Sequence, residues 1–225
     1  MPRITPTQAQ RAIYIDFEGE GVRTVQGLRI PRRPVLLGVY RRGGRYTRIA
    51  LRDDGPWTEL LARGRAGFPG EARVQDLASA ISGLASECQE EDRLLLSYSE
   101  HERSVVSRFC PGESDNFEAV WRNAKTDIDA WANRSGRSER HPDINRSLEG
   151  YLISIDFPPM TGLPAGPADA IGRLRREMSR IRRWSSLGDR YQDLTRQLVD
   201  YNLRDCRGLR RLAVRAANYF ASQAR

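Results

Sequence analysis

Hydrophobic residues follow two different periodicities along this chain, and together these periodicities predict an α/β protein. Residues 13–18 read I-Y-I-D-F-E, and such alternation of apolar and polar positions is typical of a strand. Residues 194–212 place apolar side chains three or four positions apart, which is the spacing of one helix face. We expect strands at 10–18, 34–42, 45–52, 93–97 and 124–128, and helices at 74–90, 101–109, 114–123, 169–184 and 190–222.

Glycine and proline mark the breaks between these elements. The pair Gly43-Gly44 predicts a hairpin turn between the second and third strands. Residues 156–168 are rich in proline and glycine and predict a loop, either a lid over a site or an inert connector. A chain of 225 residues without a long linker is expected to form one domain over residues 1–225.

Asp16 and Glu18 are the first candidate functional residues. Because strand side chains alternate, both carboxylates project from one face, about 7 Å apart at a rise of roughly 3.3 Å per residue. Two such acids on a central strand repel each other and lose solvation, so they require a cation. Magnesium and manganese ions prefer carboxylate oxygens. The alternative interpretation is a strand end whose acids face water.

Asp205 lies on the apolar stripe of the last helix, one turn after Tyr201. A buried aspartate among leucines needs a partner charge or a metal ion. The alternatives are an ion pair with Arg204 or Arg211 for the aspartate, and simple ring packing for the tyrosine.

Glu102 lies at the expected junction between the strand 93–97 and the helix 101–109. Carboxylates at such a junction commonly face the edge of an α/β sheet where ligands bind. Glu100 is expected only to complement the helix dipole, which is also the alternative for Glu102.

The three acidic sites together resemble the DEDD superfamily of exonucleases, which has the ribonuclease H-like fold. The matching segments are Asp16-x-Glu18, Tyr98-x-x-x-Glu102 and Tyr201-Asn202-x-x-Asp205-Cys206. The last segment is most similar to a bacterial RNase H-like branch with the motif Y-N-x-x-D-C. Asp127 and the segment Asn145-Arg146-Ser147-Leu148-Glu149 resemble that branch's intervening motifs. Glu102 stands where most of the superfamily has aspartate, and Glu149 stands where the branch often has lysine.

The resemblance implies a mixed sheet of about five strands, the first three antiparallel, flanked by helices. It also implies a two-metal 3′-to-5′ exonuclease with magnesium or manganese ions as cofactors, acting on single-stranded DNA or RNA. Asp16 would bridge both ions, Glu18 and Asp205 would hold one, and Glu102 the other. Tyr201 would orient the attacking water. The alternatives are a catalytically silent nucleic-acid-binding or scaffolding module of the same fold, and an endonuclease on branched or hybrid substrates.

The charge of the chain favours a polyanionic partner, since its formal net charge is +8 and its pI about 9.9. On a helix over 169–184, four arginines would share one face and could follow a nucleic-acid backbone. These residues are Arg173, Arg176, Arg180 and Arg183. The alternative is a solvated helix face.

Other site chemistries are poorly represented. The three cysteines lack C-x-x-C spacing and the two histidines are not paired at helical spacing, which argues against zinc. Phosphate-binding glycine motifs are absent from the sequence. No run of about 20 apolar residues and no signal peptide occurs, so we expect no membrane partner and a cytoplasmic location.

Overall fold

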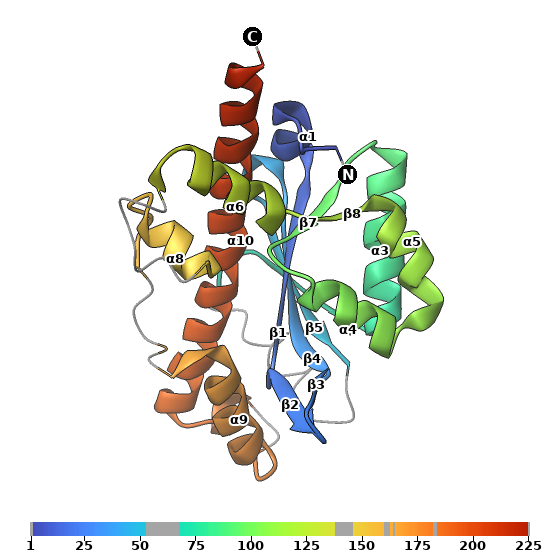
Figure 1. Ribbon diagram of the computed structural model, residues 1–225. Helices are drawn as coiled ribbons and strands as arrows, with labels where there is room; N and C mark the ends of the chain where they lie inside the picture. Colours follow the sequence, from blue (N-terminus) through green and yellow to red (C-terminus); the bar gives the residue numbers. More distant parts are fainter. Residues whose placement is uncertain are drawn as a thin grey trace.

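The computed structural model describes residues 2–52, 68–137, 146–159, 163, 165–181 and 184–224. Its centre is a mixed six-stranded sheet in the order β6-β5-β4-β1-β7-β8 (Figure 1). The strands are β1 Ile13–Gly19, β4 Pro34–Tyr40, β5 Tyr46–Leu51, β6 Glu71–Gln75, β7 Leu95–Ser97 and β8 Trp121–Asn123. The pairs β1/β4 and β4/β5 are antiparallel, as predicted, while β5/β6, β1/β7 and β7/β8 are parallel. The expectation of an α/β protein with a mixed sheet is therefore confirmed.

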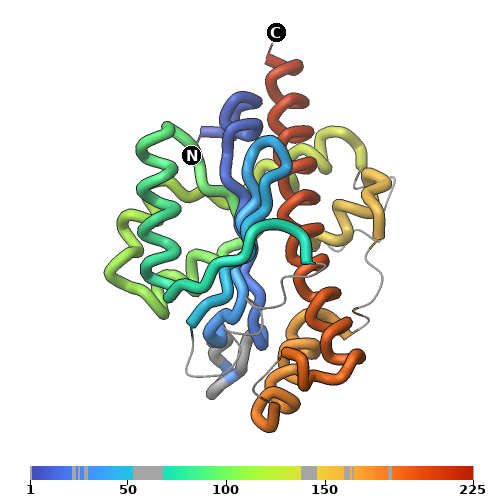
Figure 2. Tube along the Cα trace, turned by 180° about the vertical axis from the view of Figure 1, so that it is seen from behind, coloured from blue at the N-terminus to red at the C-terminus, as the bar shows by residue number. Residues whose placement is uncertain are grey.

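Helices cover both faces of this sheet (Figures 1 and 2). One face packs against α10, which spans Asp189–Gln223 and contacts β1 and β4. Around α10 lie α1 Pro6–Arg11, α6 Lys125–Arg134, α8 Leu148–Ile153 and α9 Gly166–Met178. The opposite face carries α3 Leu77–Glu90, α4 His101–Phe109 and α5 Ser114–Val120. Short 3₁₀ turns occur at Arg42–Gly44, Pro111–Glu113 and Trp184–Ser186.

The alternation in β1 separates two hydrophobic cores. Ile13, Ile15 and Phe17 pack with residues of α3, α4 and α5. Tyr14 points the other way and packs among residues of α10. Since strand side chains alternate, Asp16 and Glu18 share the α10 face with Tyr14, as the sequence predicted.

A small hairpin that the sequence pattern did not predict follows β1. It consists of β2 Val22–Val25 and β3 Leu28–Pro31, paired antiparallel. Gln26 and Gly27 form its two-residue turn with φ of 50° and 81°. Positive φ at both positions is the requirement of the hairpin turn type that matches strand twist.

Two expected boundaries in the first half of the chain were wrong. The strand expected at 10–18 begins only at Ile13, because Thr5 and Gln8 form a capping box that starts α1 just before it. The helix expected at 74–90 begins at Leu77, where the Asp76 carboxylate accepts a hydrogen bond from the Ser79 amide at 2.8 Å. The residues before it form the exposed edge strand β6, which lacks a clear apolar alternation.

Four expectations in the second half were also wrong. Residues 125–128 belong to α6, not to a strand, and Ala124 is its N-cap; the Asn123 side chain accepts from the Lys125 amide at 2.9 Å in the turn that leads into this helix. The strand is β8, so α5 ends at Val120 instead of 123. The helix expected at 169–184 ends at Met178. In the loop expected at 156–168, residues 160–162 and 164 lie outside the described residues, and α9 already begins at Gly166, with Pro167 in its first turn.

In the part of the chain that the structure describes, no helix is both long and apolar enough to cross a membrane.

Candidate active site

Three elements bring the predicted acidic residues together. Asp16 and Glu18 lie on β1, at the middle of the sheet. The parallel neighbour β7 leads directly into α4, whose first turn carries Glu102. On the α10 face, Asp205 approaches the same place, and its carboxylate interacts electrostatically with both β1 acids. The topology thus assembles carboxylates that are 189 positions apart in the sequence, from Asp16 to Asp205.

Burial governs the electrostatics of this acidic cluster, defined as Asp16, Glu18, Glu102 and Asp205. Glu18, Glu102 and Asp205 are buried, with 5%, 4% and 8% of their surface exposed. Loss of solvation raises the pKa of Glu18 to about 8 and that of Glu102 to about 7. Desolvation likewise raises the pKa of Asp205 to about 7, although the adjacent Arg204 opposes the rise. Ionisation of all four acids at neutral pH is therefore unfavourable without a compensating cation.

Asp16 is the most affected member of the acidic cluster. Burial raises its pKa well above the usual range, and the charges of Glu18, Asp205 and Glu102 raise it further. A contact between the Asp16 and Glu18 carboxyl groups raises the pKa of Asp16 and lowers that of Glu18. Desolvation and mutual repulsion thus disfavour simultaneous ionisation of Asp16 and Glu18.

Asn202 holds the Asp16 carboxylate in place, a role that the sequence interpretation missed. Asn202 is fully buried on α10. Its amide nitrogen donates to Asp16 Oδ2 at 2.9 Å and to the Asp16 carbonyl at 3.1 Å. Its oxygen accepts from the Tyr46 hydroxyl at 2.8 Å. The available signal was an asparagine three positions before Asp205, on the inward side of the same helix.

Gly38 makes room for this asparagine. It lies on β4 directly opposite Asp16 in the antiparallel register. A Cβ atom added to Gly38 would lie 1.7 Å from the Asn202 side-chain oxygen. The glycine is therefore required for close approach of α10 to the sheet, and the approach carries Asn202 to Asp16.

Asp205 is flanked by Tyr201 and Arg204. A hydrogen-bonding contact with the Tyr201 hydroxyl lowers the pKa of Asp205, and burial together with the nearby acids raises the pKa of Tyr201. Arg204 Nη1 lies 3.3 Å from Asp205 Oδ1, so the alternative ion pair predicted for this aspartate is present in the structure. Arg204 binds Glu149 more closely, at 2.5 and 3.0 Å.

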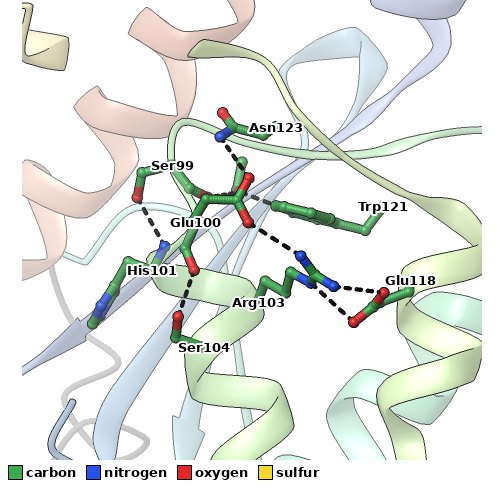
Figure 3. Close-up of polar contacts among 9 residues, drawn as sticks. Ser99, Glu100, His101, Arg103, Ser104, Glu118, Trp121 and Asn123 are labelled. Atoms are coloured by element: carbon green, nitrogen blue, oxygen red, sulfur yellow. Dashed lines mark hydrogen bonds and ion pairs between the residues drawn. The ribbon is translucent and has the colours of Figure 1, made fainter. Parts of the chain in front are cut away.

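Glu102 and Glu100 have different surroundings, as expected. The Ser99 hydroxyl donates to Glu102 Oε2 at 3.3 Å, which favours the charged form of this buried acid. Glu100 instead accepts from Asn123 at 3.0 Å and pairs with Arg103 at 3.7 Å (Figure 3). Arg103 in turn pairs with Glu118 at 2.9 Å. Glu100 is thus engaged in contacts that join α4 to α5 and β8.

The donor set of the acidic cluster fits a hard divalent cation by its chemistry. Glu18 Oε1 is buried and has no hydrogen-bond partner, and carboxylate oxygens are the ligands that magnesium and manganese prefer. Among the described residues, however, no three His, Cys, Asp or Glu side chains converge closely enough to hold an ion in this conformation. The cluster therefore supplies the charge for a metal, but its side chains would have to rotate to supply the geometry.

The predicted arginine stripe does not form one helix face. Arg173 pairs with Asp169 at 2.7 Å, and Arg176 lines a surface cavity. Arg180 lies beyond the end of α9, where the Ser179 hydroxyl bonds the Arg176 carbonyl at 2.8 Å and competes with further helical bonding. Arg183 lies outside the described residues.

Asp127 and His101 make contacts of their own. The Asp127 carboxylate accepts from the Ile4 amide at 2.8 Å and so fastens the N-terminal segment to α6. The backbone amide of His101 donates to the Ser99 hydroxyl at 3.2 Å, and burial lowers the pKa of the imidazole. His101 is therefore neutral at physiological pH.

Comparisons with known proteins give no further assignment: no protein family, no curated protein and no solved structure matches this chain.

Proposed function

We propose that this protein is a metal-dependent nuclease of the ribonuclease H-like fold, acting as a 3′-to-5′ exonuclease on single-stranded ends. The observation that carries the proposal is the acidic cluster: four carboxylates from three elements, three of them buried, with raised pKa values. Such an arrangement is costly for a folded chain unless a cation offsets the repulsion. Perturbed carboxylates gathered at one place are typical of catalytic sites.

The sheet supports the same proposal. The DEDD resemblance implies a mixed sheet whose first three strands are antiparallel, and β1, which carries the first two acids, pairs in this way with β4 and β4 with β5, while β6 is a further strand beyond β5. The last acid comes from a helix packed on this strand.

The residues have distinct expected roles. Asp16, Glu18, Glu102 and Asp205 would hold two divalent ions, which, when bound, would activate a water and stabilise the leaving oxygen of a phosphodiester. Asn202 orients Asp16 through its amide nitrogen. Tyr201 keeps its proton at neutral pH, because its pKa is raised, so its hydroxyl remains able to orient a water next to Asp205. Release of Asp205 from Arg204 would accompany metal loading.

Two measurements on the same preparations test this proposal. Mn²⁺ or Mg²⁺ should raise the melting temperature, by about 5–10 °C at a hundred times the dissociation constant. Among end-labelled single- and double-stranded DNA and RNA substrates, the single strands should be degraded from the 3′ end with metal, and all substrates should stay intact with EDTA. First cuts at internal positions of the labelled strand would indicate an endonuclease instead.

Two aspartate substitutions provide the control. Asp16→Asn should abolish both the metal-induced shift and the cleavage while the protein stays folded. Asp115→Asn removes an equal charge from an exposed position on α5 and should leave both unchanged. If the protein binds oligonucleotides but shows neither the metal-induced thermal shift nor metal-dependent cleavage, it is the catalytically silent binding module.

A further inference from the structure

A second feature of the molecule lies beside the acidic cluster, at the point where β1 ends. Two adjoining cavities of about 420 and 320 Å³ share Glu20, Arg32 and Arg175. Arg33, Arg108 and Arg176 complete the charged lining. We call these five arginines and Glu20 the basic cavity. It draws on the β3–β4 connection, the end of α4 and the last turn of α9, which are far apart in the sequence.

Like charge dominates this basic cavity. Glu20 is its one acid among the described lining residues, and it pairs with both Arg32 and Arg175, with a distance of 3.2 Å to Arg175 Nε. Arg33, Arg108 and Arg176 have no ion pair with a described residue. Clustered guanidinium groups without matching carboxylates repel one another, and guanidinium is the side chain best matched to phosphate oxygens.

The basic cavity is close to the acidic cluster along two elements. Glu20 follows Glu18 by two residues, so their Cα atoms are at most about 7 Å apart. Arg108 follows Glu102 by six residues on α4, about 9 Å along the helix axis. A single strand whose end is held at the acidic cluster would therefore reach these arginines with its next phosphates.

We propose that the basic cavity binds the phosphates of a single-stranded nucleic acid and that Glu20 occupies the place of one phosphate until the strand arrives. This inference rests on the proposed function for its substrate class. It adds which arginines bind the phosphates and which carboxylate competes with them. Glu20 holds two guanidinium groups at once, which is the bridging position that a phosphate oxygen pair takes. Strand binding exchanges one anion for another and displaces the Glu20 carboxylate toward solvent.

Binding of a labelled single-stranded oligonucleotide in EDTA tests the proposal without cleavage, by anisotropy over a range of salt concentrations. The double variant Arg33→Gln/Arg108→Gln should flatten the slope of log K against log salt by about 1.4, at roughly 0.7 per phosphate contact. Glu20→Gln should tighten binding and steepen the slope by about 0.7 or more, since it removes the carboxylate that competes with phosphate for Arg32 and Arg175. Its oligonucleotide affinity should therefore rise, although the variant removes two ion pairs.

The matched control is Arg134→Gln/Arg190→Gln, which removes the same charge from exposed positions on α6 and α10, outside the basic cavity. It should change the slope by much less than the cavity variant. Equal losses from both double variants, or weaker binding by Glu20→Gln, would overturn the assignment. Measurements with Mn²⁺ separate the two proposals. If the cavity variants lose oligonucleotide binding but keep the metal-induced thermal shift, the nuclease proposal stays intact. Normal binding by cavity variants in a metal-dependent nuclease would refute only the basic cavity.

Discussion

The substitution Gly38→Ala tests the site without touching any acidic residue. A Cβ atom at this position would lie 1.7 Å from the Asn202 oxygen and 2.7 Å from its Cγ. Asn202 would have to move by more than about 1 Å to restore ordinary contact. Its three hydrogen bonds, to Asp16 and Tyr46, leave no alternative position that keeps them.

The expected cost follows from these contacts. Overpacking of a buried site costs about 1–3 kcal/mol, and each lost hydrogen bond adds roughly 1 kcal/mol. We therefore expect Gly38→Ala to lower the free energy of unfolding by about 2–5 kcal/mol. If Asp16 shifts with Asn202 by about 1 Å, cleavage per folded molecule should fall about a hundredfold.

The assay is chemical denaturation combined with turnover measured on folded protein. Gly83→Ala is the control, because Gly83 lies in α3 and a Cβ atom added there would meet nothing within 4 Å. Alanine at this position should stabilise the helix by about 0.5–1 kcal/mol. The double variant Gly38→Ala/Asn202→Ala should be markedly less destabilised than the sum of the single variants. Additive effects, or a neutral Gly38→Ala, would refute the proposed contact and the positioning role of Asn202.

Two further predictions concern charge and the tyrosine. In EDTA, the melting temperature should fall as the pH rises from about 4.5 to 8, because raised pKa values make the folded acids bind protons that the unfolded chain releases. The free energy of unfolding should fall by about 1.4 kcal/mol per pH unit for each proton that the folded state binds in excess of the unfolded chain. This dependence on pH should be weaker in Glu102→Gln. A flat or rising profile would contradict the buried acidic cluster. Tyr201→Phe should change the free energy of unfolding by less than about 1 kcal/mol but lower turnover roughly ten- to a thousandfold. Substrate affinity should stay near that of the unsubstituted protein. Early melting with normal turnover would make Tyr201 a packing residue.

The local sequence pattern was sufficient to predict on which faces of β1 and α10 several site residues lie. Alternation in β1 predicted that Tyr14, Asp16 and Glu18 share one face of the strand, since strand period decides this without tertiary information. Helical spacing likewise placed Asp205 on the buried face of α10, one turn from Tyr201. These features depend on residues close in sequence, so the sequence is sufficient to predict them.

Boundaries and edges depended on contacts that periodicity does not contain. The 124–128 segment was predicted as a strand, but the Asn123 side chain accepts a hydrogen bond from the Lys125 amide and the chain continues as the helix α6. Edge strand β6 gains its structure from pairing with β5, although its own side chains show little alternation. The arginine stripe failed for the same reason, because α9 ends at Met178 before the stripe is complete.

Only the tertiary structure decided the surroundings of the acids. The contact between Asn202 and Asp16 joins residues 186 positions apart, and it depends on the absence of a side chain at Gly38. The basic cavity likewise combines arginines from three separated segments with Glu20. A sequence lists charges and sizes, but the pKa of a carboxylate and the partner of a guanidinium depend on distance and desolvation, which arise only when the layers pack together.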